Sequence, residues 1–112
     1  RTFMIKYKKK KPTGELKLFQ EIWSNTKYRH CENCDVKIES FSPVNFSHIV
    51  PKGKRNDLRL DPNNIELLCF PCHYKYEFGT LDEIRSMKHS DKKKEYLKEN
   101  NYMRYAKIWG DD

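Results

Sequence analysis

The sequence contains few large apolar residues and no long hydrophobic segment. Leu, Ile, Val and Phe make up about 21% of its 112 residues, and the longest unbroken apolar run covers only residues 67–70. A bilayer-spanning helix needs about 20 apolar residues, so the sequence excludes a transmembrane helix. The length suits one small domain. Because so few apolar residues give a lean core, we expect a metal site or disulfides to stabilise it.

Acidic residues are in the minority, with 16 Asp and Glu against 23 Lys and Arg and a net charge of +7. A basic surface attracts polyanions, chiefly nucleic acid and less often an acidic membrane. High solubility alone is the alternative interpretation. Basic residues cluster in 6–11, 52–59 and 92–107, and two of these clusters flank the motif region described below. That position favours DNA as the partner, and we expect no membrane association.

Turn residues and apolar spacing predict a small α+β fold. Residues 1–12 are basic and unpatterned, which predicts an extended arm. Thr13 suits a helix N-cap, and Thr80 with Glu83 forms a capping-box pattern. Gly79 suits a left-handed residue just after a helix. The patterns predict helices over 15–24, 71–78, 80–88 and 90–109, and strands over 46–50 and 65–70.

The four cysteines form two identical pairs, Cys31-x2-Cys34 and Cys69-x2-Cys72. Two residues between cysteines let both sulfurs bind one Zn²⁺, and two such pairs complete a tetrahedron. Disulfides and free thiols are the alternatives. No secretion-signal pattern precedes the cysteines, so we expect a reducing compartment, which favours the metal. The sequence therefore predicts a structural zinc site that contributes folding free energy.

The segments between and after the cysteine pairs carry a specific set of motifs. They are Phe-Ser-His-Ile-Val-Pro over 46–51, Asp-Pro-Asn-Asn-Ile-Glu-Leu-Leu over 61–68, and a histidine directly after the last cysteine. In order and spacing, His48, Asn64 and His73 resemble the His, Asn, His pattern of the HNH nuclease family. Many members of that family carry two Cys-x2-Cys pairs around the pattern. The resemblance covers about residues 16–79.

The family resemblance implies a ββα-metal fold, in which a β-hairpin and a helix hold one metal ion. It implies that residues 1–112 form a single HNH nuclease domain stapled by a zinc knuckle of four cysteines. The knuckle and the ββα core would occupy 13–79, and flanking helices would occupy 80–112.

The resemblance also assigns a role to each motif residue. His48 corresponds to the general base, and a histidine with a pKa near 6.5 is mostly neutral and proton-accepting at pH 7. Asn64 corresponds to the residue that ties down the loop between the strands and so orients the His48 backbone. His73 corresponds to a ligand of the catalytic divalent ion.

Position 47 departs from the family pattern. Many members place Asp or His immediately before the general base, where it ligates the metal, but this chain has Ser47. Glu77 lies four residues after His73, on the same helical face, so these two side chains predict a metal-binding pair. One His and one carboxylate, with water, suit Mg²⁺, Mn²⁺ or a similar ion. An exposed surface residue is the alternative interpretation of Glu77.

These features predict a metal-dependent DNA endonuclease, in which His48 activates water and one divalent ion acts at the scissile phosphate. Basic residues of the loop between the strands are expected to contact DNA phosphates. They are Lys52, Lys54, Arg55 and Arg59. Two alternatives remain open: a non-catalytic, zinc-stabilised DNA-binding module, and an adaptor in a phage or mobile-element assembly. Similarity to phage-encoded members implies the cytoplasm of a bacterial host as the location.

Overall fold

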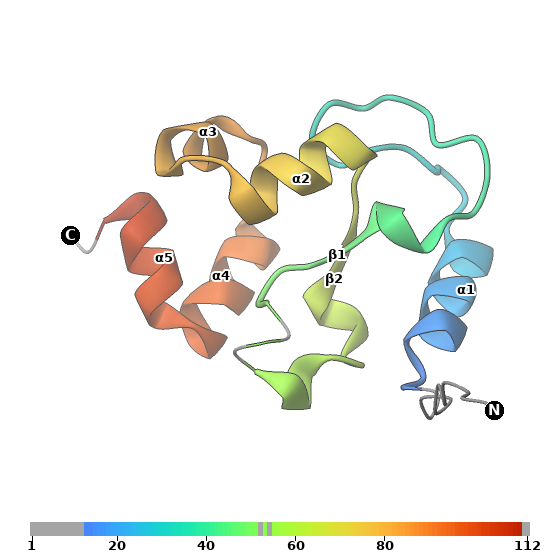
Figure 1. The fold of residues 1–112 in the computed structure, drawn as a ribbon, viewed down its shortest axis with the longest axis horizontal. Coiled ribbons are helices and arrows are strands. Elements are labelled where there is room, and N and C mark those ends of the chain that lie inside the picture. The colour runs from blue at the N-terminus through green and yellow to red at the C-terminus, as the bar shows by residue number, and fades with distance from the viewer. Residues whose placement is uncertain (1–12, 52, 54, 111–112) are drawn as a thin grey trace, which may run out of the picture.

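The computed structural model describes residues 13–51, 53 and 55–110, and its fold is α+β (Figure 1). The predicted N-terminal arm, Lys52 and Lys54 lie outside the described residues. Along the chain the elements are α1 (Glu15–Asn25), η1 (Pro43–Asn45), β1 (Phe46–His48), η2 (Asn56–Leu58), η3 (Pro62–Asn64), β2 (Ile65–Leu67), α2 (Phe70–Phe78), α3 (Leu81–Ser86), α4 (Asp91–Asn100) and α5 (Tyr102–Trp109). In this described part of the chain, every helix is too short or too polar to cross a membrane.

The two strands form an antiparallel hairpin in the middle of the molecule. Its register pairs Phe46 with Leu67, Ser47 with Glu66, and His48 with Ile65. Successive side chains of a strand point to opposite faces, so Phe46 and His48 share one face of the hairpin while Ser47 lies on the other. Figure 1 shows α1 on one side of the hairpin and α2 to α5 on the other.

Apolar side chains pack on both sides of the hairpin. On the α1 side, Phe19 stacks on Phe46 with ring centroids 4.8 Å apart, and Ile38 and Leu67 complete the buried cluster. A larger cluster fills the side of α2 to α5. Its buried members are Cys31, Ile49, Val50, Leu68, Cys72, Tyr76, Ile84, Met87, Leu97 and Ile108. Two of the four cysteines belong to this cluster, so the predicted zinc site is continuous with the core.

The predicted single helix over 90–109 is wrong. The structure has two helices there, α4 and α5, which meet at Asn101. Asn101 has a φ of −154°, and its side chain accepts a hydrogen bond from the N–H of Arg104, so it ends α4 and caps α5. The break lets α5 fold back, and Leu97 and Ile108 are thereby buried in the same cluster.

The remaining elements agree with the sequence in type but differ at their ends. The capping box of Thr80 and Glu83 is confirmed, with both of its hydrogen bonds present at the start of α3. The strands are shorter than predicted, because β1 ends at His48 and β2 ends at Leu67. The α+β class and the succession of hairpin and helix are confirmed.

Two glycines, Gly14 and Gly79, stand where the local geometry requires them. Gly14, with a φ of 90°, occupies the N-cap position of α1, and Thr13 accepts a first-turn N–H at 3.2 Å. The prediction that Gly79 is left-handed is wrong, because its φ is −74°. A Cβ at Gly79 would lie 2.5 Å from the carbonyl oxygen of Lys75, so close backbone approach explains this glycine.

A buried ion pair joins the C-terminal helices to the hairpin. Lys93 of α4 places its Nζ 2.5 Å from Oε2 of Glu66 on β2, and the two side chains are only 4% and 6% exposed. The ammonium also lies 4.1 Å from the centre of the Tyr76 ring. Burial raises the pKa of Glu66 and lowers that of Lys93, while the attraction between the two charges opposes both shifts.

We expect Lys93→Met to lower the free energy of unfolding by about 3–5 kcal/mol at pH 7, because it leaves the Glu66 carboxylate buried without its partner. The loss should shrink as the pH falls. With its pKa raised by burial, Glu66 binds a proton more readily in the folded than in the unfolded state, so acid favours folding of the variant. Urea unfolding at pH 5 and pH 7 measures this. Lys92→Met, at an exposed neighbouring position, is the control, and equal losses in both variants would contradict the prediction.

Candidate metal centres and active site

The four cysteine sulfurs lie together at the junction of the loop after α1 and the start of α2. Each Sγ is within 4.8 Å of the other three, and the Sγ atoms of Cys34 and Cys69 are 3.7 Å apart. Zn–S bonds of about 2.3 Å in a tetrahedron separate the sulfurs by about 3.8 Å, whereas a disulfide needs about 2.05 Å. None of the four cysteines forms a disulfide. They are positioned to bind a structural metal such as zinc.

Local hydrogen bonds shape the cysteine cluster. The N–H groups of Asn33 and Cys34 both point at the Sγ of Cys31, at 3.4 Å, and the Asn33 amide donates to the Sγ of Cys72 at 3.2 Å. Asp35 completes the first turn in a left-handed conformation, with a φ of 68°. The Asn33 side chain therefore links the two cysteine pairs, which lie 35 or more residues apart in sequence.

The acidities of the thiols differ within the cluster. Burial opposes ionisation of Cys31, but the N–H groups aimed at its sulfur lower its pKa to about 7. Burial raises the pKa of Cys69 to about 12 and also raises that of Cys72. Four thiolates so close together need a compensating cation. The chemistry of this donor set therefore fits a divalent metal.

His73 and Glu77 form a second candidate metal site on α2. His73 directly follows Cys72, so the cysteine cluster fixes its place in the first turn of the helix. The carbonyl oxygen of Val44 lies 2.7 Å from Nδ1 of His73. Because a carbonyl can only accept, Nδ1 must carry the proton in the neutral ring. Such a second hydrogen bond is typical of metal-binding histidines.

The other ring nitrogen of His73 faces a carboxylate. Its Nε2 lies 3.3 Å from Oε2 of Glu77. With Nδ1 protonated, the neutral imidazole presents a lone pair to an ionised oxygen, and two acceptors at this distance are stable only with a cation between them. Either a second ring proton or a metal ion meets that need. Among the described residues no third His, Cys, Asp or Glu joins this pair.

Ser47 lies on the hairpin face opposite that of His48. Its side chain is fully buried, and its Oγ has no hydrogen-bond partner among the described residues. Its cross-strand neighbour is Glu66, whose carboxylate is already paired with Lys93. A buried, uncharged hydroxyl is a weak ligand for a divalent ion, so His73 and Glu77 are the stronger donors here.

His48 is the last residue of β1, and its ring is held on the α1 face of the hairpin. Nε2 lies 3.1 Å from the carbonyl oxygen of Arg59 and 3.5 Å from Oε2 of Glu15. Donation from Nε2 to the carbonyl makes Nδ1 the basic nitrogen of the neutral ring. Glu15, on α1, is a neighbour that sequence reasoning missed, since nothing in a first-turn glutamate indicates a contact with a strand so far along the chain.

Asn64 is fully buried where the loop between the strands rejoins β2. Its Oδ1 accepts the N–H of Val50 at 2.7 Å, and its Nδ2 donates to the carbonyl oxygens of Val50 and Leu58 at 3.2 and 3.1 Å. Its own carbonyl oxygen accepts the N–H of Ile49 at 2.7 Å. Asn64 thus ties together both ends of the loop, immediately after His48.

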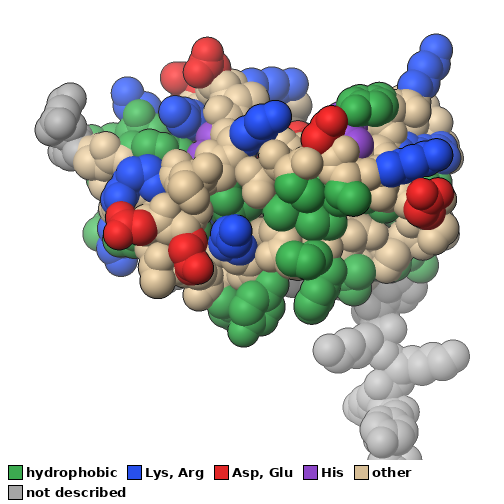
Figure 2. Space-filling view, turned by 90° about the horizontal axis from the view of Figure 1, so that it is seen from above, with side chains coloured by type: hydrophobic (Ala, Val, Ile, Leu, Met, Phe, Trp, Pro, Cys, Tyr) green, Lys and Arg blue, Asp and Glu red, His purple; other side chains and the backbone are tan. Residues whose placement is uncertain are grey.

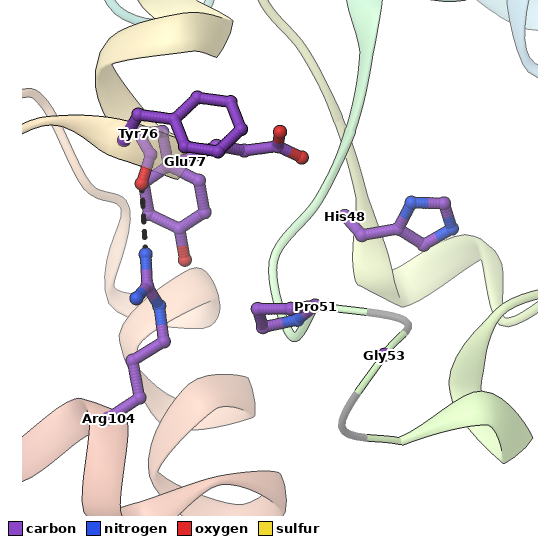
Figure 3. Close-up of a pocket in the computed structure, with 7 residues that line it drawn as sticks. His48, Pro51, Gly53, Tyr76, Glu77 and Arg104 are labelled. Atoms are coloured by element: carbon purple, nitrogen blue, oxygen red, sulfur yellow. Dashed lines mark hydrogen bonds between the residues drawn. The ribbon is translucent and has the colours of Figure 1, made fainter.

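A cavity of about 290 Å³ separates the hairpin loop from α2 and α5 (Figure 3). Its described lining comes from His48, Pro51, Gly53, Tyr76, Glu77, Phe78 and Arg104. Figure 3 shows His48 and Arg104 on opposite sides of this space, with the Glu77 carboxylate directed toward the hairpin and the His48 ring turned away from Glu77. His48 and Glu77 therefore both border the cavity, while the imidazole itself lies against Arg59 and Glu15. Phe78 and Arg104 were not predicted as site residues.

The two described residues predicted to contact DNA are both engaged in ion pairs. Arg55 donates to the two carboxylate oxygens of Asp57 at 2.9 and 2.8 Å, and to the carbonyl oxygen of Asn100 at 2.9 Å. The Nε of Arg59 lies 3.4 Å from the Glu15 carboxylate. A DNA phosphate would have to compete with these carboxylates for the two guanidinium groups.

Comparison with protein-family models gives one match, to the HNH endonuclease model, over residues 31–78. The matched segment includes the four cysteines, the hairpin and α2. It leaves α1 and α3 to α5 outside. Comparison with curated proteins and with solved structures gave no match.

Proposed function

Because residues 31–78 are an HNH domain with a cysteine cluster suited to zinc, we propose that the protein is a metal-dependent endonuclease that hydrolyses DNA phosphodiester bonds. The observation that carries the proposal is the pairing of His73 and Glu77. The Val44 carbonyl accepts a hydrogen bond from Nδ1 of His73, and the second ring nitrogen lies 3.3 Å from the Glu77 carboxylate, so both groups could ligate one cation. Glu77 of this pair lines the cavity that His48 also lines.

In the proposed reaction, His48 takes a proton from the attacking water through Nδ1. The Arg59 carbonyl keeps the proton on Nε2, and the nearby Glu15 carboxylate stabilises the imidazolium that results. Asn64 holds the segment after His48 in place through its hydrogen bonds to Val50 and Leu58. A divalent ion such as Mg²⁺ or Mn²⁺, held by His73 and Glu77, would offset negative charge at the scissile phosphate.

We also propose that the described elements act as one nuclease domain, with the helices outside the matched segment as structural parts of it. Phe19 of α1 stacks on the hairpin, and Lys93 of α4 pairs with the hairpin from the other side. Exposed lysines of α4, at 92 and 98, add to the positive charge that attracts DNA. Thiolate ligands require a reducing compartment, for which the cytoplasm of a bacterial host is the proposed location.

The test is nicking or linearisation of supercoiled plasmid by the purified, zinc-loaded protein at increasing Mg²⁺ or Mn²⁺. We expect Glu77→Gln to raise the metal concentration for half-maximal cleavage by about 10- to 100-fold, because an amide oxygen binds a hard dication less strongly than a carboxylate. The melting temperature should not change, since Glu77 is exposed. Glu21→Gln, at an exposed position of α1, is the matched control. Wild-type rates for Glu77→Gln at limiting metal would refute the assigned ligand.

Ser47 favours one alternative, a zinc-stabilised module that binds DNA without cleaving it. The position holds a buried hydroxyl where many members of the family have a charged or imidazole ligand. DNA binding with no cleavage at any concentration of Mg²⁺, Mn²⁺ or Ni²⁺ would support this alternative over the endonuclease.

A further inference from the structure

We propose that the cavity between the hairpin loop and α5 is a nucleotide subsite, in which Arg104 binds a phosphate next to the scissile one. The inference rests on the proposed nuclease function and adds to it a residue from outside the matched HNH segment. Arg104 belongs to α5, and the break at Asn101 that turns α5 back on α4 brings it to the cavity.

The guanidinium group of Arg104 is only partly used by the protein. Its Nη2 donates to the carbonyl oxygen of Tyr76 at 2.9 Å, which satisfies a carbonyl in the last turn of α2. Its Nε is buried without an acceptor, no described residue accepts a hydrogen bond from Nη1, and no described carboxylate pairs with the group, so Nη1 is the donor left for a ligand. By contrast, Arg55, Arg59 and Arg85 each have an acidic partner.

The surroundings of the Arg104 guanidinium favour binding of an anion from outside the protein. Arg104 is the one positively charged residue in the described lining of the cavity. Its guanidinium carbon lies 4.9 Å from the centre of the Tyr76 ring, which holds the group in a fixed orientation. A planar guanidinium with unused donors is the side chain best suited to bind a phosphate.

The walls of the cavity suit the rest of a nucleotide. Pro51 and Phe78 supply apolar surface beside the polar groups. Phe78 ends a row of exposed aromatic residues along α2, with Phe70, Tyr74 and Phe78 at 59%, 58% and 68% exposure. Figure 2 shows hydrophobic side chains gathered on this face of the molecule. Of these three, Phe78 alone belongs to the described lining of the cavity, and an exposed aromatic ring there can stack with a base of any sequence.

Position and size indicate a neighbouring nucleotide rather than the scissile phosphate. Glu77 and His48 line the cavity away from the Arg104 guanidinium, as Figure 3 shows. The volume of about 290 Å³ lies at the lower end of the range for small-molecule sites. One sugar with its phosphate or base fits such a space, and the strand would continue from there toward Glu77.

The first experiment compares two substrates, a DNA duplex and bis(p-nitrophenyl) phosphate, which has no neighbouring phosphate. We expect Arg104→Gln to lower the kcat/KM for the duplex, divided by that for bis(p-nitrophenyl) phosphate, by about 10- to 100-fold. Lys107→Gln, an equal change of charge at an exposed position of α5, should leave the ratio as in wild type. Equal losses on both substrates would overturn the subsite in favour of contact with the scissile phosphate. Wild-type kcat/KM values on both substrates would leave Arg104 as a helix cap alone and also overturn it.

A second pair of variants tests the subsite without changing Arg104, so that a folding defect in Arg104→Gln does not decide the outcome. Phe78→Ala removes exposed apolar wall without touching the Arg104 to Tyr76 hydrogen bond, and Phe70→Ala is its matched control on the same helix. We expect Phe78→Ala to weaken DNA binding at least about fivefold more than Phe70→Ala does. Equal effects of the two substitutions would count against the subsite.

DNA binding separates failure of this inference from failure of the nuclease proposal. Affinity for a fluorescein-labelled duplex is measured against salt without added Mg²⁺ or Mn²⁺. Loss of one phosphate contact in Arg104→Gln should reduce the slope of log affinity against log salt by about one. If the wild type cleaves neither substrate, the endonuclease proposal fails, and this slope still decides the subsite: an unchanged slope overturns it.

Discussion

Removal of the metal from the cysteine cluster is expected to unfold the protein. Zinc binding by four thiolates contributes about 10–16 kcal/mol to folding of small domains, whereas a domain of this size has a total stability of about 5–15 kcal/mol. Cys31 and Cys72 are buried in the larger core cluster, so loss of the metal leaves a gap in the core as well as four unpaired thiols. Far-UV circular dichroism during titration with a strong zinc chelator measures the effect.

The same treatment should abolish DNA cleavage in a way that only zinc reverses. His73 follows Cys72 directly, so its place beside Val44 and Glu77 depends on an intact cluster. Added Mg²⁺ cannot rebuild a thiolate site, because hard cations prefer oxygen ligands. Cys69→Ser is expected to reproduce the unfolding without chelator. Full helical signal after complete zinc removal, less than about half an equivalent of zinc in fresh protein, or intact disulfides would contradict the prediction.

The sequence predicts best those parts of the molecule that depend on short-range spacing. Two residues between paired cysteines fix the distance between their sulfurs, and the four-residue step from His73 to Glu77 places both on one helical face. The capping box at Thr80 is equally local. In each case the covalent chain alone limits how far apart the groups can lie. These predictions therefore required no knowledge of the tertiary fold.

Contacts made across the fold could not be predicted in this way. The approach of Glu15 to His48 depends on how α1 packs against the hairpin, and that of Arg104 to the cavity depends on the break at Asn101. The helical pattern over 90–109 is continuous, and the choice of Asn101 as the break becomes clear only when the folded-back α5 buries Ile108. The pairing of Arg55 with Asp57 likewise changes the environment of a predicted phosphate contact.

His48→Gln is the strongest test of the proposal that His48 is the general base. The amide nitrogen of glutamine can still donate to the Arg59 carbonyl, which holds Nε2 of His48 at 3.1 Å, but the amide cannot accept the proton of the attacking water. Loss of a general base lowers rates by about 10²- to 10⁴-fold. We therefore expect cleavage of plasmid DNA to fall by that factor, with the melting temperature and DNA affinity close to those of the wild type.

Two comparisons separate loss of the base from a structural effect. His30→Gln is the matched control, because His30 bonds to the Tyr28 carbonyl and to Asp35, away from the cavity. It should cleave DNA at nearly the wild-type rate. His48→Ala leaves space beside the cavity, and added imidazole should restore part of its activity by acting as the missing base. A His48→Gln protein that cleaves as fast as His30→Gln would show that His48 does not activate the water. Another group would then have to act as the base.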